Sequence, residues 1–335
     1  MKKVPDIHSK EAKDFCVMWD EGTHIDKLRI CNIKGISYQQ GKDFRSAYKI
    51  NELPIDEKQV PDFGWEEQLK RMADMDELVA YHMKYPIEVT IKIETKQPIA
   101  VPMTADWHLG APGVDYDSFV KDVKFMRDTD GIRPLIGGDG YHNIIQASKV
   151  GSGMNQSPIC VQKAVYYNVL KELKEKILAI STGNHNYWTA MAEGEDWDGE
   201  LARRLKVVYL KHFAMINLVV GDYPYPILRI HKSRFNSSFN LTHNCKQNQR
   251  VYYPDARIVV VEHNHTAAIE QYRYNENECV AIRTGTYDVY DDYAMQNGFF
   301  GSYVCNPTVV LFPDKDKIVG FKDMQDAAIY LKAVR

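Results

Sequence analysis

Long apolar stretches are missing from this chain of 335 residues, and no run approaches the roughly 18 consecutive apolar residues that a membrane-spanning helix needs. Lys2 and Lys3 stand near the N-terminus, but charged residues follow them instead of the apolar segment of a secretion signal. An excess of basic residues is also missing, because 42 Lys and Arg stand against 45 Asp and Glu. Binding of nucleic acid would therefore depend on local Lys and Arg placement or on metal ions. No membrane partner is expected.

Cysteine is scarce, with six residues and no Cys-x-x-Cys pair. This scatter argues against a zinc ribbon and against a disulfide scaffold, and it predicts reduced thiols in a cytoplasmic protein. With 44% hydrophobic and 26% charged residues, the chain has the composition of an ordinary globular protein and enough length for a full core and a second domain. This composition is compatible with a homo-oligomer as well as with a monomer.

Residues 1–85 predict a small helical accessory domain. Apolar residues recur at helical spacing from about residue 10 to residue 84, and the last of these helices covers 65–82. A helix-turn-helix that binds DNA is one interpretation, because Gly35 marks a turn between two such helices. A plain helical docking domain is the other, because Lys34 and Gly41 stand where two packed helices would prefer apolar side chains.

Residues 86–335 predict a larger α/β domain. Near residue 86 the hydrophobic period changes from helical to alternating, which predicts a half-buried strand over 87–93 and a second strand over 99–103. Strands and helices then alternate, and strands dominate from about residue 215. The further predicted elements are strands at 135–136, 177–180, 227–230, 258–261, 280–283 and 309–312, and helices at 158–176 and 198–205. This order predicts sheets stacked in the middle with helices outside.

Polar motifs follow three of the apolar strand-like runs. They are Asp106-Trp107-His108, Gly138-Asp139 with His142 three residues on, and Gly183-Asn184-His185. Later segments add His231 and the pair His263 and His265. Seven of the 11 histidines fall in or beside this series, namely His108, His142, His185, His231, His243, His263 and His265. A lone histidine on an apolar strand is usually a core residue, but packing alone rarely produces such clustering, so the series predicts a metal site.

The spacing of these residues suits metal ligation. Asp106 and His108 alternate at a strand end, so both side chains can face one ion. Gly137 and Gly138 let the backbone approach closely, and a carboxylate at Asp139 can then bridge two cations about 3.5–4 Å apart. Mixed nitrogen and oxygen ligands suit Mn²⁺, Fe or Zn²⁺ better than Mg²⁺, and Mn²⁺ is our expectation.

The ordered set of Asp-x-His, Gly-Asp-x-x-His, Gly-Asn-His, a lone His and His-x-His resembles the calcineurin-like metallophosphoesterases over about residues 99–266. The resemblance implies a four-layer α/β/β/α sandwich and two divalent metal ions. A water or hydroxide shared by both ions is then the expected nucleophile, because the ions lower its pKa from 15.7 to roughly 7. The resemblance assigns Asp139 as the bridge, gives one ion Asp106, His108 and His265, and gives the other Asn184, His231 and His263.

His185 and His142 are the two motif histidines left for work on the phosphate. In the family, the histidine of Gly-Asn-His faces the substrate, where it can stabilise phosphate oxygens or protonate the leaving alkoxide. His142, three residues after Asp139 and followed by Asn143, resembles the DNA-repair exonuclease branch of the superfamily. This resemblance favours cleavage of a phosphodiester in nucleic acid.

The segment from His231 to His243 resembles the corresponding stretch of phage-encoded members of the family, where it lies on the substrate side. Lys232, Arg234 and His243 are therefore expected to bind substrate, with Lys232 and Arg234 on phosphates. Phe235 or Phe239 would then stack on a base. A solvated charged loop is the alternative.

Two departures from the family pattern bear on the site. Asn186 stands where an acid is common, so a carboxylate that orients His185 is expected to be missing. Glu262 precedes His263 where glycine is usual. It either accepts a hydrogen bond from a ligand imidazole or crowds the site.

The sequence thus predicts a two-metal phosphodiester hydrolase that acts on nucleic acid, with DNA favoured over RNA. A phosphomonoesterase or a small-nucleotide phosphodiesterase is the alternative, because the chain carries a net charge of -3 and no basic tract. A DNA-binding regulator with a decayed site is a third hypothesis, and the presence of the whole predicted ligand set argues against it.

Overall fold

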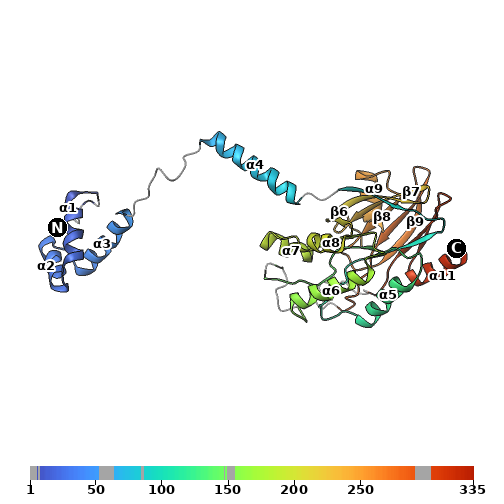
Figure 1. The fold of residues 1–335 in the computed structure, drawn as a ribbon, viewed down its shortest axis with the longest axis horizontal. Helices are drawn as coiled ribbons and strands as arrows, with labels where there is room; N and C mark the ends of the chain where they lie inside the picture. The colour runs from blue at the N-terminus through green and yellow to red at the C-terminus, as the bar shows by residue number, and fades with distance from the viewer. Residues whose placement is uncertain are drawn as a thin grey trace. The chain divides into compact units, whose positions relative to one another are not determined.

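The protein forms two compact units, residues 1–83 and residues 84–335. The computed structural model describes residues 6, 8–52, 64–83, 87–146, 148, 155–290 and 303–335. Figure 1 shows helices in the first unit and a body of stacked strands and helices in the second. The predicted helix over 65–82 is present as α4 (Trp65–Met83). No helix in the described ranges has both the length and the apolar character to cross a membrane.

Three helices pack together in the first unit, α1 (Lys10–Glu21), α2 (His24–Lys34) and α3 (Tyr38–Glu52). Their ends follow local chemistry. The Ser9 side chain caps α1 by accepting a hydrogen bond from the Ala12 N–H, and Thr23 and Asp26 form a capping box at the start of α2. Gly35 ends α2 in the left-handed conformation, with φ 70°. Only residues 35–37 separate α2 from α3, which is the short connection of a helix-turn-helix.

Lys34 and Gly41 are both compatible with packed helices, although the sequence suggested that apolar side chains would be needed at these positions. Gly41 is buried, and a Cβ atom on it would lie 2.6 Å from the Trp19 ring and 2.8 Å from Cys31 Sγ. The missing side chain is therefore what lets α3 approach α1 and α2. Lys34 pairs with Glu11 instead of facing the core.

The second unit contains two sheets of six strands each within the described ranges. The first sheet has the order β1 (Glu88–Ile93), β6 (Phe213–Val220), β7 (Tyr223–Ile230), β8 (Ile258–Val261), β10 (Asn277–Arg283) and β9 (Ala268–Tyr274). The second has the order β12 (Ile318–Phe321), β11 (Thr308–Leu311), β2 (Ile99–Thr104), β3 (Leu135–Ile136), β4 (Ala179–Ser181) and β5 (Tyr209–Leu210).

Helices cover the outer faces of both sheets. On the outside of the second sheet lie α5 (Tyr116–Asp128), α6 (Ile159–Leu173), α8 (Trp197–Leu205) and α11 (Met324–Val334), and α9 (His243–Tyr252) covers the first sheet (Figure 1). Helix α7 (Asn184–Glu193) follows β4. The predicted four-layer α/β/β/α sandwich is confirmed.

The period-two alternation of the strands divides the core into layers. In β2, Ile99, Val101 and Met103 pack between the two sheets, whereas Ala100 faces the helices. In β8, Ile258 and Val260 pack between the sheets, and the alternate residues face α9. Both faces of these strands are buried, which explains their unbroken apolar sequences.

Candidate metal centre

The predicted ligands lie at the carboxyl ends of neighbouring parallel strands. In the second sheet, β2, β3 and β4 run parallel, and each of the three motifs follows one of them. In the first sheet, β7 and β8 run parallel and are followed by His231 and by the segment 262–265. Carboxyl ends of parallel strands meet at one edge of a sheet, so the fold brings together motifs that are distant in sequence.

Several of the predicted ligands have left-handed backbone conformations. The φ angles are 52° for Asp106, 47° for His108, 55° for Asp139, 74° for His263 and 57° for His265. Such conformations cost about 1–3 kcal/mol each for residues other than glycine, and they persist where the surrounding structure enforces them. Their concentration at these strand ends is the pattern expected of a functional site.

Asp106, His108 and His265 form one group of side chains. His108 Nε2 lies 3.0 Å from His265 Nε2, and His265 Nε2 lies 3.7 Å from Asp106 Oδ1. The other carboxylate oxygen, Asp106 Oδ2, accepts hydrogen bonds from the His263 backbone N–H (3.1 Å) and from Thr284 Oγ1 (3.2 Å). Asp106 is thus held from one side and presents Oδ1 to the imidazoles.

Asp139, His231 and His263 form a second group. His231 Nε2 lies 3.1 Å from Asp139 Oδ2 and 3.0 Å from Asn184 Oδ1. The other oxygen, Asp139 Oδ1, accepts a hydrogen bond from the His185 backbone N–H at 2.9 Å. The structure therefore brings together all seven residues that the sequence predicts as metal ligands. Whether they bind ions stays a prediction.

The donor set fits a pair of divalent cations. Asp106 Oδ1 is buried and has no hydrogen-bond partner in the part of the chain that the structure describes, and the buried Asp139 Oδ2 lies 3.1 Å from His231 Nε2, itself a predicted ligand. Buried polar atoms of this kind normally have a partner, and a cation provides one. Burial lowers the pKa of His263 to about 4 and of His265 to about 3, so both imidazoles are neutral at pH 7, as ligation requires.

The carboxylates give this site a strong preference for positive charge. Burial alone would lower the pKa of His231, but Asp139 and Glu262 raise it to about 10. Burial, followed by the nearby carboxylates of Asp139 and Glu262, raises the pKa of Asp106 to about 8. Without metal, the site therefore retains protons that bound cations would replace.

The third group contains the two histidines expected to act on the phosphate, His142 and His185, together with His108. The His185 Nδ1 atom lies 2.6 Å from the His142 carbonyl oxygen, so it donates a hydrogen bond to that oxygen. His185 also packs against Trp188, with 4.4 Å between ring centroids. His142 Nδ1 lies 3.4 Å from His108 Nδ1, and its Nε2 atom is buried without a hydrogen-bond partner among the described residues. A backbone carbonyl therefore orients His185.

Asn186 stands where the family commonly has a carboxylate, and its side chain contacts a carboxylate from elsewhere in the chain, Asp198. Asn186 Nδ2 donates hydrogen bonds to both carboxylate oxygens of Asp198, at 3.0 and 2.8 Å. Asp198 also accepts a hydrogen bond from Thr182 Oγ1 at 2.6 Å. This network fixes the start of α7 but does not include the imidazole of His185.

The sequence suggested a hydrogen bond between Glu262 and a ligand imidazole, and this contact is present, but sequence reasoning missed the support that Arg229 and Thr286 give from the first sheet. Arg229 Nε donates a hydrogen bond to Glu262 Oε1 at 2.7 Å, and Glu262 Oε2 lies 3.0 Å from His231 Nδ1. Thr286 Oγ1 donates a hydrogen bond to the Asp106 carbonyl oxygen at 2.6 Å. Glutamate at position 262, where the family usually has glycine, could be noticed in the sequence. Its ion pair with Arg229 joins residues 33 apart and has no local sequence pattern.

The residues predicted to bind substrate lie on the loop after β7 and at the start of α9. Lys232 and Arg234 are exposed on this loop, and His243 is half-buried as the first residue of α9. The Arg234 guanidinium lies 4.9 Å from the Phe235 ring centroid and 5.4 Å from that of Tyr252. The structure leaves the proposed contacts with substrate untested.

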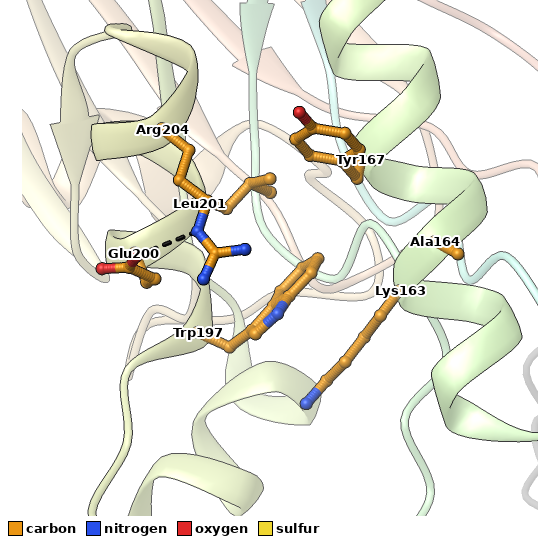
Figure 2. Close-up of a pocket in the computed structure, with 7 residues that line it drawn as sticks. All are labelled: Lys163, Ala164, Tyr167, Trp197, Glu200, Leu201 and Arg204. Carbon is orange, nitrogen blue, oxygen red and sulfur yellow. Dashed lines mark hydrogen bonds and ion pairs between the residues drawn. The ribbon is translucent and has the colours of Figure 1, made fainter.

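A small surface cavity of about 200 Å³ lies between α6 and α8, away from these groups (Figure 2). Lys163 Nζ lies 5.3 Å from the Trp197 ring centroid, and Arg204 pairs with Glu200 at 2.9 Å. Ligand sites usually enclose about 300–1,000 Å³. The cavity is smaller than that, and its two cationic groups already have partners.

The sequence matches no protein-family model and no curated protein. Among solved structures, vacuolar protein sorting 29 from Cryptosporidium parvum is 14% identical, with a TM-score of 0.39 over 68% of this chain and 100% of its own. Zinc-bound Vps29 from Entamoeba histolytica is 11% identical, with a TM-score of 0.34 over 67% and 98%. Sulfate thiohydrolase SoxB from Thermus thermophilus is 10% identical, with a TM-score of 0.35 over 72% and 60%. These low values describe a likeness of fold alone.

Proposed function

We propose that the protein is a metal-dependent phosphodiesterase that cleaves nucleic acid, with DNA as the favoured substrate. The observation that carries the proposal is the convergence of three groups of histidine and aspartate side chains at one set of strand ends. The motifs that build these groups are those of the calcineurin-like metallophosphoesterases, with the phage-encoded and DNA-repair members as the proposed branch.

Seven residues would hold two divalent ions, with Mn²⁺ preferred over Fe, Zn²⁺ or Mg²⁺. They are Asp106, His108 and His265 for one ion, Asn184, His231 and His263 for the other, and Asp139 between them. When bound, such ions offset the charge of the phosphate and make a water-derived nucleophile available near pH 7.

His185 and His142 supply the remaining chemistry. Because His185 Nδ1 donates to the His142 carbonyl oxygen, its Nε2 atom is the one left to protonate the leaving oxygen or to bind a phosphate oxygen. His142 adds a second imidazole to the same group, and its buried Nε2 atom makes no hydrogen bond with the described residues and can therefore bind a phosphate oxygen. An additional contact of this kind suits a phosphate that carries sugar on both sides.

The loop after β7 is suited to a polymeric substrate. Lys232 and Arg234 offer exposed positive charges, and Phe239 is fully exposed on the same loop. An exposed aromatic ring beside cationic side chains is the arrangement that binds single-stranded nucleic acid by stacking and phosphate contacts.

The test is hydrolysis of several substrates in parallel. Purified protein with Mn²⁺ is offered single-stranded DNA, duplex DNA, RNA and a small aryl phosphate. The proposal predicts that DNA is cleaved fastest, that excess chelator abolishes turnover, and that Mn²⁺ restores it better than Mg²⁺. A strong preference for the aryl phosphate would identify the protein as a phosphomonoesterase, and full turnover in excess chelator would exclude a metal mechanism.

The role of His142 separates the two substrate classes further. His142→Gln should lower DNA cleavage far more than hydrolysis of the aryl phosphate, because the second imidazole contacts the more substituted phosphate. The metal content should stay at the wild-type value. Equal losses on both substrates would contradict the assigned role.

A further inference from the structure

Glu262 is a buried carboxylate that contacts both halves of the site. It follows β8 of the first sheet, and its Oε2 atom accepts a hydrogen bond from the Gly138 backbone N–H, which follows β3 of the second sheet, at 2.9 Å. The same oxygen lies 3.0 Å from His231 Nδ1, which follows β7. One side chain therefore joins the segments that carry Asp139 and His231.

The charge of Glu262 is balanced by Arg229. The Arg229 side chain is fully buried, donates through Nε to Glu262 Oε1 at 2.7 Å, and also contacts Oε2. Its Nη1 atom donates to the Lys211 carbonyl oxygen at 2.7 Å. A buried carboxylate needs such compensation, because an unpaired charge in the interior is strongly destabilising.

The backbone leaves room for this side chain. A Cβ atom on Gly137 would lie 2.3 Å from Glu262 Oε1 and 2.4 Å from the Ala105 Cβ atom. Glycine at position 137 is thus compatible with a carboxylate that reaches the Gly138 N–H, and a larger residue is not.

We infer that Glu262 is a positioning residue that holds His231 Nε2 toward Asp139 and fixes the spacing between the two sheets at the second ligand group. With His231 Nδ1–H donating to Glu262, the tautomer is set and Nε2 keeps its lone pair for a metal ion. His231 Nε2 lies 3.1 Å from Asp139 Oδ2 in this arrangement. The inference rests on the proposed function only in naming a metal ion as the ligand.

The test begins with the metal-free protein, labelled with ¹⁵N-histidine and followed by NMR. The wild type should show a hydrogen-bonded, downfield Nδ1–H proton that is absent in His231→Gln, and Glu262→Gln should shift that proton strongly upfield. An unchanged resonance in Glu262→Gln would overturn the inference. This measurement needs no metal and no turnover.

Mn²⁺ titration by calorimetry provides the second readout. Glu262→Gln should weaken one of two binding events by about 10- to 100-fold, the usual effect of removing such a supporting carboxylate. The matched control is Asp122→Asn, which alters another buried carboxylate, bonded to Tyr287 and Gln325, and should leave Mn²⁺ binding unchanged. If the wild type binds no Mn²⁺, the proposed function fails, while the NMR result still decides the role of Glu262.

A double variant separates positioning from charge balance. Arg229→Met with Glu262→Met removes both buried charges and should fold, because apolar residues often replace a buried ion pair without loss of stability. Its Mn²⁺ affinity should stay as low as that of Glu262→Gln, since His231 Nδ1 no longer contacts a carboxylate at position 262. Recovery of wild-type affinity would show that only charge balance mattered and would overturn the inference.

Discussion

Asp198 is a buried carboxylate whose hydrogen-bond donors, Thr182 and Asn186, are both neutral. Burial raises its pKa from 3.8 to about 7. A raised carboxyl pKa means that the folded state binds the proton more tightly than the unfolded state, so this group's stabilising contribution is fully present below about pH 4 and is lost as the pH rises to about 7. Asp198→Asn should remove this pH dependence of the free energy of unfolding, because an amide does not titrate between pH 4 and pH 8. Urea unfolding of both proteins between pH 4 and pH 8 measures the difference, and parallel curves would contradict the assignment.

At the same scale, a variant of His185 can distinguish a role of this residue in catalysis from a role in metal binding. His185→Ala should slow DNA cleavage by roughly 10²–10⁴, the usual effect of losing a general acid, and leave the bound metal unchanged. Single-turnover kinetics and metal analysis of the purified variant check the two parts. Because His185 also groups with His108 and His142, loss of an ion in this variant would show that the third group is itself a metal site.

At the scale of elements, the loop between β4 and α7 approaches the loop after β3 so closely that only glycine fits. A Cβ atom on Gly183 would lie 2.0 Å from Asp139 Oδ1, and one on Gly138 would lie 2.4 Å from the Gly183 nitrogen. Gly183→Ala should therefore displace the Asp139 carboxylate and abolish binding of both ions. Gly64→Ala is the matched control, because a Cβ atom there meets nothing within 4 Å. Wild-type Mn²⁺ binding by Gly183→Ala would contradict the proposed bridge.

The helices and strands differ in how well the sequence predicts them. Strands such as β8 are buried on both faces and give apolar runs that sequence analysis detects. Helix α9 has no such signal, because it buries Asn244, Asn248 and Gln249 and stabilises them by hydrogen bonds instead of apolar packing. The ligand motifs were visible because they are local, whereas the ion pair of Arg229 with Glu262 arises only when β7 and β8 lie side by side.

At the scale of the whole molecule, the helical unit is expected to help hold the substrate. If α3 is a recognition helix that follows the short turn after α2, its exposed Lys42 lies where a phosphate contact is expected. Lys42→Glu should weaken binding of duplex DNA and reduce the slope of affinity against salt by about 1, with aryl phosphate hydrolysis unchanged. Lys13→Glu makes the same charge change at an exposed position of α1 and serves as control. Equal DNA affinity in both variants and the wild type would favour the docking-domain interpretation.

The most direct test of the two-metal centre is Mn²⁺ binding to the full-length protein, measured by calorimetry and by electron paramagnetic resonance. The account predicts two ions per chain with a spectrum of magnetically coupled Mn²⁺, and it predicts that Asp139→Asn loosens both ions and abolishes the coupling along with DNA cleavage. Binding of no ion, or two uncoupled ions whose affinity is the same in Asp139→Asn, would contradict it.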